Sequence, residues 1–451
     1  MLSATVLFNR IRGYLWDSTE NEPMNILVIG NGGREHALAW KIKESPLCQK
    51  IFVAPGNAGT AMIAENVALD VNDFEGLGKF CVKNSIGLVV VGPEGPLVNG
   101  IRDYFENDTS LAGILMIGPG KMGAQLEGSK DYSKQFMHRH NIPTAKARSF
   151  IVSDLSQALE YISSCKPPIV LKADGLAAGK GVIISLSQGE AKAVIKEMLV
   201  NKRFGAASAK VLIEEFLNGI ELSVFVLTDG KDYVILPEAK DYKRIGEGDT
   251  GPNTGGMGAV SPVVFADSSF MQKIEELVVK PTIAGLNHEG IDYKGFIFVG
   301  IMNVGGNPFV IEYNARMGDP ETQAVMPRIK SDFVELLVAA GKGELKDKKI
   351  EIDEHFAVTI ALVSGGYPGE YETGKVIHGL DKEGQAMVFH AGTMKQKEQV
   401  LTHGGRVLAV SGKGNSLSEA RDLAYKTAAQ INWDGLYYRK DIGQDLLNYK
   451  R

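Results

Sequence analysis

Short, continuous apolar runs alternate with amphipathic segments between residue 25 and about residue 126. NILVIG, KIFVAPG, GLVVVGP and ILMIGP read as buried strands, and helices are expected from Glu35, around residues 74–83 and over LVNGIRDYF. Buried apolar strands that alternate with helices are typical of a parallel, doubly wound α/β sheet. We therefore predict an N-terminal Rossmann-like domain over residues 24–126.

The pattern changes after residue 127, where strands are punctuated by glycine and the chain reads as α+β. From His355 onward, FAVTIALV, AMVFHAG and RVLAVSG read as short strands, and SLSEARDLAYKTAAQ reads as a helix. A compact third unit with a small mixed sheet is expected there. The predicted boundaries are 127–350 for the central region and 351–451 for the C-terminal domain.

The composition argues against several functional classes. Charged residues make up 23% of the chain and the formal net charge is -5, so the basic excess of nucleic-acid and anionic-membrane binders is missing. The three cysteines lack CxxC or Cys/His spacing, which argues against a disulfide framework or a zinc site. No apolar run approaches the roughly 18 residues of a membrane helix. We expect a cytoplasmic protein without nucleic-acid or membrane partners, monomeric, with a dimer as the alternative.

Residues 1–23 precede a methionine, Met24, that stands directly before the first expected strand. We interpret them as a leader that is disordered or loosely docked, or as the product of a misassigned start. The alternative is an amphipathic transit peptide. Arg10 and Arg12 favour it, whereas the acidic stretch DSTENE argues against it.

The stretch ILVIGNGGREHALAW begins like a dinucleotide-binding βαβ unit. That fingerprint needs GxGxxG and an acidic residue about 20 positions further on. Here Glu35 occupies the third glycine position, and the second strand ends at residues 54–57 without a carboxylate. An oxidoreductase is therefore the weaker alternative. A glycine turn before a helix suits a small anion such as phosphate, with Arg34 adding charge, unless the glycines serve geometry alone.

PPIVLKADGLAAGKGVIISLS places Lys172 at the end of one apolar run and several glycines before the next. A Walker loop does not fit, because Asp174 and Gly181 stand where glycine and Ser or Thr are needed. A strand is expected to follow, so the segment reads as a glycine hairpin that folds over a triphosphate, with an ordinary hairpin as the alternative. In KVLIEEFLNGIELSVFVL, residues 214–217 offer backbone groups to an adenine edge, and Glu221 offers a carboxylate to a ribose.

The strand FVIEYNAR places Glu312 and Asn314 on one face, with Arg316 next along it if the strand continues. Two oxygen ligands are what magnesium needs beside phosphates and water, and the arginine suits a carboxylate or a transferring phosphoryl group. A solvated polar face is the alternative. The glycine-rich DYKRIGEGDTGPNTGGMGAVSP reads as a long loop that binds an anion or acts as a flexible lid.

With hairpin, linker and E-x-N strand in this order, the central region resembles the ATP-grasp superfamily, whose two α+β lobes hold ATP between them. GNGGREHALAW, GPEGPL, EGSKDYSK, KADGLAAGKGV, EEFLNGIE, GPNTGGMGA and IEYNARMGDPETQ together are similar to the phosphoribosylamine glycine ligases, also called glycinamide ribonucleotide synthetases. The resemblance runs from Met24 to about Gly443 and includes SGGYPGEYETGK and LYYRKDIG. It implies a two-lobed ATP-grasp domain over 127–350, with a small lobe at about 145–215.

The resemblance implies ATP-dependent ligation of glycine to 5-phosphoribosylamine through a glycyl phosphate, giving glycinamide ribonucleotide, ADP and phosphate in purine biosynthesis. The alternative is an ATP-grasp ligase for another small carboxylate and phosphoribosyl intermediate, and a nucleotide-binding module without turnover belongs to a different class. Phosphoryl transfer needs positioning and charge neutralisation, and the sequence offers no Ser/His/Asp constellation. His36 is expected to be packed rather than to act as a base.

Motif by motif, the resemblance also implies roles for single residues. ATP is expected at Lys130, Lys172, Gly175, Gly179, Lys180, Gly181, Glu214, Glu215, Phe216, Leu217 and Glu221, with its phosphates at the first two lysines. A metal, Mg²⁺ or Mn²⁺, is expected at Glu312 and Asn314, and GFIFVGIM lacks the further metal-binding acid that many ATP-grasp enzymes carry there. Arg316 and Asp319 are the expected catalytic groups. Substrates are expected at Asn31, Gly32, Gly33, Arg34, Glu35, Gly92, Pro93, Glu94, Asp241, Asn253, Thr254, Gly255, Gly256, Arg316, Asp319 and Pro320.

Overall fold

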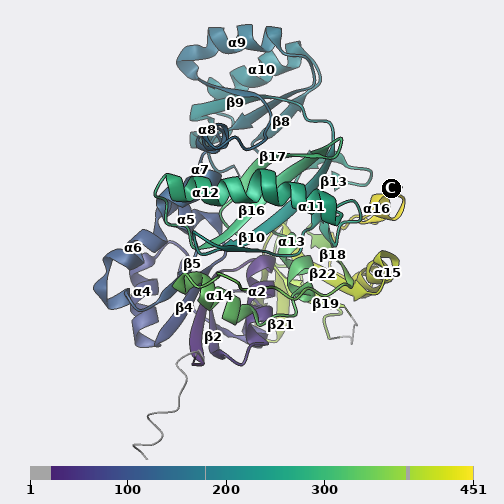
Figure 1. Cartoon of the computed structure of the whole chain (residues 1–451). Helices are drawn as coiled ribbons and strands as arrows, with labels where there is room; N and C mark the ends of the chain where they lie inside the picture. The colour runs from purple at the N-terminus through teal and green to yellow at the C-terminus, as the bar shows by residue number, and fades with distance from the viewer. Residues whose placement is uncertain (1–21, 178, 382–385, 450–451) are drawn as a thin grey trace, which may run out of the picture.

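The computed structural model describes residues 22–177, 179–381 and 386–449 (Figure 1). The predicted leader lies almost wholly outside these ranges. The N-terminal unit is a five-stranded sheet in the order β3-β2-β1-β4-β5, and every neighbouring pair is parallel, which confirms the predicted doubly wound sheet. Its strands are β1 (Met24–Gly30), β2 (Cys48–Pro55), β3 (Glu65–Asn66), β4 (Ile86–Val91) and β5 (Leu115–Ile117), and its helices are α2 (Gly33–Lys43), α3 (Thr60–Ile63), α4 (Phe74–Lys83), α5 (Glu94–Asn99), α6 (Ile101–Asn107) and α7 (Lys121–Gly128).

The structure contains two helices where the sequence predicted one. The segment LVNGIRDYF contributes to both α5 and α6, which meet at Gly100. Gly100 has a φ of +90°, a left-handed conformation that ends a helix and that other residues rarely adopt. The prediction of one continuous helix was wrong because the apolar pattern runs through the glycine without a change of period.

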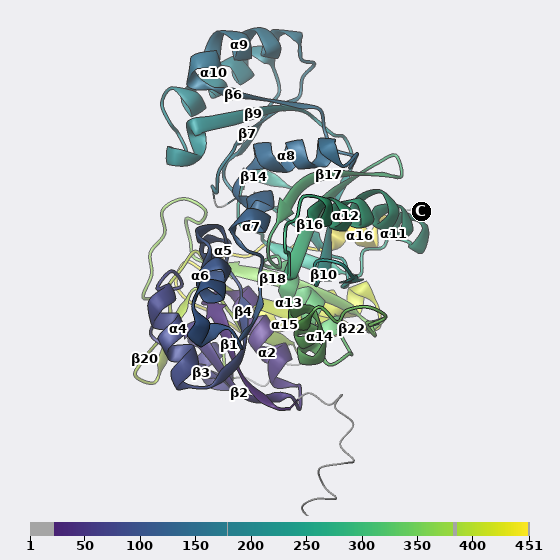
Figure 2. The same ribbon diagram turned by 60° about the vertical axis from the view of Figure 1, so that its left-hand side comes forward.

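The central region consists of two lobes that are well separated in both views (Figures 1 and 2). The small lobe is an antiparallel sheet in the order β6-β9-β7-β8, and the large lobe is an antiparallel sheet in the order β11-β10-β16-β17. In the small lobe are β6 (Ala147–Ile151), β7 (Ile169–Ala173), β8 (Val182–Ser185), β9 (Lys210–Glu215), α9 (Leu155–Ser164) and α10 (Gln188–Leu199), and in the large lobe β10 (Ile220–Thr228), β11 (Tyr233–Ile235), β16 (Gly295–Val304), β17 (Asn307–Asn314), α11 (Ser268–Ile274) and α12 (Lys280–His288).

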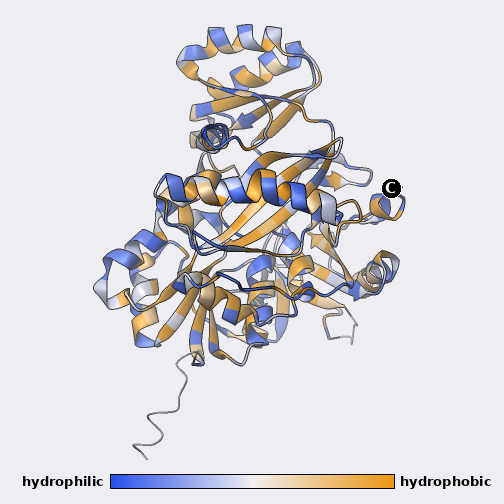
Figure 3. Cartoon of the chain, viewed as in Figure 1, coloured by the Kyte–Doolittle hydropathy of each residue, from blue (hydrophilic) through white to orange (hydrophobic). Residues whose placement is uncertain are grey.

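Helix α8 (Lys130–Arg139) lies between the two lobes, as Figure 2 shows. The strand expected after the glycine hairpin is present as β8. In both lobes the strands are mainly hydrophobic and the helices alternate between hydrophobic and hydrophilic residues (Figure 3), as expected where one face of each helix covers a sheet. Within the described ranges, no helix is long and apolar enough to span a membrane.

The C-terminal unit is built on a sheet in the order β12-β15-β18-β22-β19, whose pairs are all antiparallel. The prediction of a mixed sheet was wrong because the pattern indicates strands but not their directions. Two of its strands come from the central region, so the sheet crosses the predicted boundary at residue 350, and the boundary stays a prediction. The elements are β12 (Lys240–Asp241), β15 (Gly258–Ser261), β18 (Phe356–Val363), β19 (Met387–His390), β22 (Arg406–Gly414), the hairpin β20 (Thr393–Gln396) with β21 (Gln399–Thr402), and α13 (Glu321–Val325), α15 (Leu417–Ala428) and α16 (Gln444–Leu447). Helix α14 (Phe333–Lys342) packs instead against β5 and α2 of the N-terminal unit and β16 of the large lobe.

The long glycine-rich stretch that was predicted as a loop or lid is ordered as short strands. Between β12 and β15 it forms the hairpin of β13 (Arg244–Gly246) and β14 (Thr250–Asn253). Arg439, from the C-terminal unit, holds this hairpin through Asp249 at 2.7 Å and through the carbonyl of Arg244 at 3.0 Å. The loop prediction was wrong because these strands are too short to show a period in the sequence.

Candidate functional site

A cavity of about 870 Å³ opens where the small lobe, the large lobe and the carboxyl end of the N-terminal sheet come together. It collects most of the predicted site residues from segments far apart in the chain. Those that line it are Arg34, Glu94, Lys130, Lys172, Gly179, Gly181, Glu214, Glu215, Phe216, Leu217, Glu221, Asp241, Asn253, Thr254, Gly255, Glu312, Asn314, Arg316 and Asp319. The predicted residues that do not line it are Asn31, Gly32, Gly33, Glu35, Gly92, Pro93, Gly175, Lys180, Gly256 and Pro320.

At the small-lobe end of the cavity, Lys172 of β7 and Glu214 of β9 form a buried ion pair. The Lys172 Nζ lies 3.0 Å from Glu214 Oε2 and donates to the carbonyl of Ile311 at 2.9 Å. The other carboxylate oxygen, Glu214 Oε1, is buried and has no hydrogen-bond partner within the described residues. Because buried polar atoms are nearly always satisfied, this oxygen marks a place where a ligand donor fits.

In the middle of the cavity, Lys243 lies among three carboxylates. Its Nζ pairs with Glu221, lies 3.3 Å from Glu312 Oε1 and comes within 4.0 Å of Asp241 Oδ2. Lys243 is the main cause that holds the pKa of Glu312 down at about 2, whereas burial raises the pKa of Asp241 to about 6. Lys172 and Lys130 also lower the pKa of Glu312, so several lysines together offset the negative charge of these carboxylates.

The donor set of the E-x-N strand fits a divalent cation that also binds phosphates. Glu312 and Asn314 alternate on β17 and offer a carboxylate and an amide oxygen, which are hard ligands. In the part of the chain that the structure describes, no group of three or more His, Cys, Asp or Glu side chains is arranged to hold a metal. Opposite Glu312 stands Gly300, where an added Cβ would come within 2.9 Å of Glu312 Cγ. That position of β16 therefore has no space for a second acid.

Arg316 lies just beyond the end of β17, at Asn314, rather than on the strand. Its Nη2 donates to Glu127 Oε1 at 2.7 Å and to Asn314 Oδ1 at 3.1 Å. Its Nε lies 3.4 Å from Glu94 Oε2 and, like Glu214 Oε1, is buried without a hydrogen-bond partner in the described ranges. The second oxygen of Glu127 accepts the N–H of Ala315 at 2.8 Å, so Glu127 orients the guanidinium.

Opposite charges alternate at the N-terminal end of the cavity. Burial would raise the pKa of Glu94, but Arg316 and Arg34 outweigh it and lower that pKa to about 2. Burial would also raise the pKa of Asp319, but Arg406 and Arg34 outweigh it and lower that pKa. Both carboxylates therefore stay ionised beside arginines, an arrangement that suits a substrate carrying both an amine and a phosphate.

Glu35 does not face the cavity, and both of its carboxylate oxygens bind within the glycine turn. Oε2 accepts the N–H of Gly32 at 2.6 Å, and Oε1 lies 2.5 Å from Arg34 Nε. An added Cβ at Gly92 would come within 2.1 Å of Glu35 Oε1, so the GPEGPL loop packs directly on this carboxylate. His36 is buried, its Nδ1 accepts the N–H of His390 at 2.8 Å, and burial lowers its pKa to about 3, as a packed side chain requires.

The predicted site left out several charged residues that line the cavity, among them Glu127, Lys134, Lys243 and Arg406, although the first three stand inside motifs that the sequence analysis used. Glu127 and Lys134 belong to the EGSKDYSK segment, and Lys243 stands two positions after Asp241, where a strand would put both on one face. Nothing in the sequence marked Arg406 as a site residue, because it is simply the first residue of an apolar strand. Its Nη1 donates to the carbonyls of Gly255 and Asp319, each at 2.5 Å, so a C-terminal side chain joins two predicted substrate segments.

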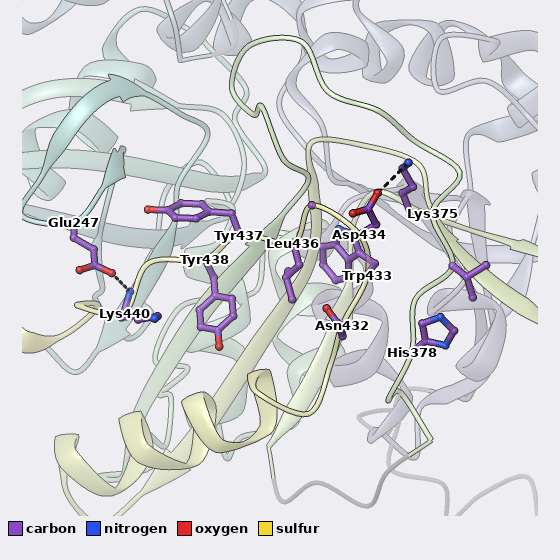
Figure 4. Close-up of a pocket in the computed structure, with 12 residues that line it drawn as sticks. Glu247, Lys375, His378, Asn432, Trp433, Asp434, Leu436, Tyr437, Tyr438 and Lys440 are labelled. Carbon is purple, nitrogen blue, oxygen red and sulfur yellow. Dashed lines mark hydrogen bonds and ion pairs between the residues drawn. The ribbon is translucent and has the colours of Figure 1, made fainter.

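A second cavity, of about 900 Å³, lies on the C-terminal unit around residues 432–440. Figure 4 shows Lys375 reaching toward Asp434 and the N–H of Lys440 donating to Glu247. None of the predicted site residues is among those that line it. The chemistry expected from the sequence therefore belongs to the first cavity.

Known proteins resemble the chain over nearly all of the described ranges. It matches phosphoribosylglycinamide synthetase in the N domain over residues 24–127, in the ATP-grasp (A) domain over 128–322 and in the C domain over 357–445. It is 49% identical to the phosphoribosylamine–glycine ligase of Escherichia coli (strain K12) and 47% identical to that of Yersinia pestis, in each case over 93% of this chain and 98% of the relative.

A crystal structure of the phosphoribosylamine–glycine ligase from Thermotoga maritima superimposes with a TM-score of 0.81 at 36% identity and covers 93% of this chain and 100% of that one. Biotin carboxylase domains share the fold at far lower identity, about 16% in one case. The three domain matches and the two relatives together confirm the resemblance that the motifs indicated. The chain belongs to the phosphoribosylglycinamide synthetase family of ATP-grasp ligases.

Proposed function

We propose that this chain joins glycine to 5-phosphoribosylamine with ATP, through a glycyl phosphate, and so forms glycinamide ribonucleotide, ADP and phosphate for purine biosynthesis. The printed name of its relatives, phosphoribosylamine–glycine ligase, supports this reaction. One observation carries the proposal: a single cavity contains three groups of side chains, from its small-lobe end to its N-terminal end. These are a buried lysine–carboxylate pair, the oxygen ligands of the E-x-N strand, and a cluster of arginines and carboxylates next to glycine turns.

ATP would occupy the space between the two lobes. Lys130 and Lys172 would bind its phosphates, and residues 214–217 would contact the adenine. Support comes from the unpartnered Glu214 Oε1, a buried acceptor for a donor on the base. Glu221, which lines the same cavity and pairs with Lys243, would reach the ribose.

Glu312 and Asn314 would hold Mg²⁺ in preference to Mn²⁺, because few protein ligands and several phosphate and water oxygens suit the smaller, strongly hydrated ion. The metal, when bound, neutralises charge on the transferring phosphoryl group. The Arg316 guanidinium lines the cavity, and its Nε has no hydrogen-bond partner in the described ranges but faces Glu94 at 3.4 Å, which supports a contact with a carboxylate or acyl phosphate oxygen.

Two displacements make up the reaction. A carboxylate oxygen of glycine attacks the γ-phosphorus and ADP leaves; the amine of phosphoribosylamine then attacks the glycyl carbonyl, phosphate leaves and the amine loses a proton. Arg316 and Asp319 would orient glycine and the acyl phosphate. The glycine turn with Arg34, the GPEGPL loop with Glu94 and residues 253–256 would hold the phosphoribosylamine. Positioning and charge complementarity carry both steps, so no protein nucleophile is needed.

The test is an assay of ADP release by the full chain, which we expect to be monomeric in sedimentation velocity. Release should depend on glycine and on the amine together, and hydroxylamine should trap a glycyl hydroxamate when the amine is left out. Hydroxamate formation with another small carboxylate but not with glycine would favour the alternative ligase. If no carboxylate gives a hydroxamate, the proposal is overturned, and a nucleotide-binding module without turnover is the interpretation that remains.

A further inference from the structure

The small lobe joins the large lobe through two crossing segments, residues 142–146 and 216–219. On the first segment, Thr144 bridges Val310 of the large-lobe strand β17 and donates from Oγ1 to its carbonyl at 2.6 Å. Two residues later, the carbonyl of Lys146 accepts the N–H of Glu215 of the small-lobe strand β9 at 3.0 Å. The anchoring lobe changes between Thr144 and Lys146, so a rotation of the small lobe has to be absorbed around Ala145.

Lys134, on α8, reaches this hinge and contacts both sides of it. Its Nζ donates to Thr144 Oγ1 at 2.7 Å and to the carbonyl of Ala145 at 3.0 Å. The same Nζ lies 3.4 Å from Glu214 Oε2, next to the second crossing segment. An ammonium group has three donors, and each of them here has a partner. The side chain is only 7% exposed, so water does not compete for these contacts.

The helix that carries Lys134 is itself tied to both lobes. Near its start, Asp131 accepts hydrogen bonds from Lys210 and Ser149 of the small lobe, each at 2.5 Å. At its end, Arg139 donates to Glu289, which follows α12 of the large lobe, at 2.8 Å. Lys134 therefore projects from a rigid strut that spans the hinge.

The charge of Lys134 does not stabilise the fold. Burial lowers its pKa to about 8 although Glu214 opposes the shift, so the folded protein binds this proton more weakly than the unfolded chain does. Removing the ammonium group would leave Glu214 paired with Lys172 at 3.0 Å rather than alone. A buried charge that adds no stability but contacts the first crossing segment and the end of β9, which leads into the second, is suited to fixing a geometry.

We propose that Lys134 is a positioning residue that clamps the first crossing segment to the end of β9 and so sets the angle at which the small lobe presents Lys172 and Glu214 to the nucleotide. This inference rests on the proposed function, because it assigns the clamp to the nucleotide end of that site. Loss of the clamp loosens the lobe that holds ATP and leaves the sites for glycine and the amine in place.

The experiment compares Lys134→Met with Lys196→Met in the full chain, since Lys196 is an exposed lysine of the same lobe on α10. Lys134→Met should raise KM for ATP about tenfold, as expected for one charge-assisted hydrogen bond, and change kcat and KM for glycine by less than about threefold. Amide exchange should become faster in residues 142–146 and 216–219. Lys196→Met should match the wild type in all of these measurements.

A second variant, Thr144→Val, keeps the shape of the hinge and removes the hydroxyl partner of Lys134, so it should raise KM for ATP in the same direction by a smaller factor. The clamp is overturned if KM for ATP in Lys134→Met stays within about twofold of the wild type, or if kcat and every KM change in parallel. Should Lys134→Met not fold, Thr144→Val decides by the same criteria. A wild-type chain without glycine-dependent ADP release would instead overturn the proposed function.

Discussion

Glu35 accepts the backbone N–H of Gly32 in a hydrogen bond of 2.6 Å. Glu35, which stands where the dinucleotide fingerprint needs its third glycine, thus stabilises the glycine turn at Gly32. In a dinucleotide site the third glycine lets helix and strand pack closely around a pyrophosphate. Here a carboxylate fills that place and also pairs with Nε of Arg34, the residue of the turn that lines the cavity.

Replacement of Glu35 by alanine should therefore weaken binding of the amine substrate. We expect Glu35→Ala to raise KM for 5-phosphoribosylamine about tenfold, because the partly buried N–H of Gly32 loses its partner and the turn relaxes. KM for ATP should stay unchanged, since ATP binds between the lobes. Steady-state kinetics with Glu65→Ala, whose surface ion pair with Lys50 contributes little, provide the control. An equal rise in both KM values would contradict this assignment.

Glu312→Gln should lower kcat on the order of 100-fold, the effect of removing one preorganised electrostatic group. ATP affinity should change much less, because the carboxylate acts on charge that develops during transfer. Single-turnover ADP formation and equilibrium binding of an ATP analogue separate the two quantities. Glu344→Gln, an exposed change beyond α14, is the matched control. Near-normal turnover of Glu312→Gln would remove this residue from the site.

Arg316→Lys should impair glycyl phosphate formation by roughly 10- to 100-fold despite the conserved charge. An ammonium cannot reproduce the planar fork that contacts Glu127 and Asn314 and turns Nε toward Glu94. Hydroxamate trapping measures this half-reaction without the amine. If the yield of Arg316→Lys equals that of the wild type, the geometry of the fork does not matter and the residue serves only as a charge.

Acid should destabilise the fold partly through His36. Its pKa falls from 6.5 in the unfolded chain to about 3 in the folded protein, because burial disfavours the charged ring. Below pH 6.5 the unfolded chain binds a proton that the folded protein does not, so the free energy of unfolding decreases as pH falls. Between pH 7 and pH 5 this group should account for about 2 kcal/mol.

Chemical denaturation at both pH values provides the measurement. In His36→Asn the amide oxygen takes the place of Nδ1 as acceptor for the N–H of His390. The loss of stability between pH 7 and pH 5 should be smaller in this variant by that amount. An unchanged difference would mean that His36 already titrates normally in the folded protein.

Four strands of the N-terminal sheet were predictable because each is a continuous apolar run, in which residues such as Leu27 and Val89 are fully buried. The sequence analysis missed β3, because this strand consists of two exposed polar residues, Glu65 and Asn66. The glycine hairpin and the E-x-N strand were predictable because their polar residues interrupt apolar strands at fixed spacing. The matched domains agree with the family that these motifs indicated. The roles of the single site residues stay predictions until they are tested by substitution.

What the sequence did not reveal depends on contacts between distant segments. The position of Lys134 at the hinge follows from the return of the chain to Thr144, and Arg406 reaches Gly255 across 151 positions. Gly100 breaks a helix inside an unbroken apolar pattern. Direction and pairing of strands such as β15 and β18 likewise arise from the folded arrangement, since a period of two residues carries no information about the partner.

The pairing of β15 with β18 has a consequence for how the molecule comes apart. Gly258–Ser261 lies between β12 and β18, hydrogen-bonded to residues 357–360, and no peptide segment of the central region alone can replace that neighbour. A chain cut near residue 350 would leave β15 as a bare, apolar edge prone to self-association. The central and C-terminal regions should therefore melt in one calorimetric transition, and fragments ending at the apparent domain boundary should be recovered as aggregates.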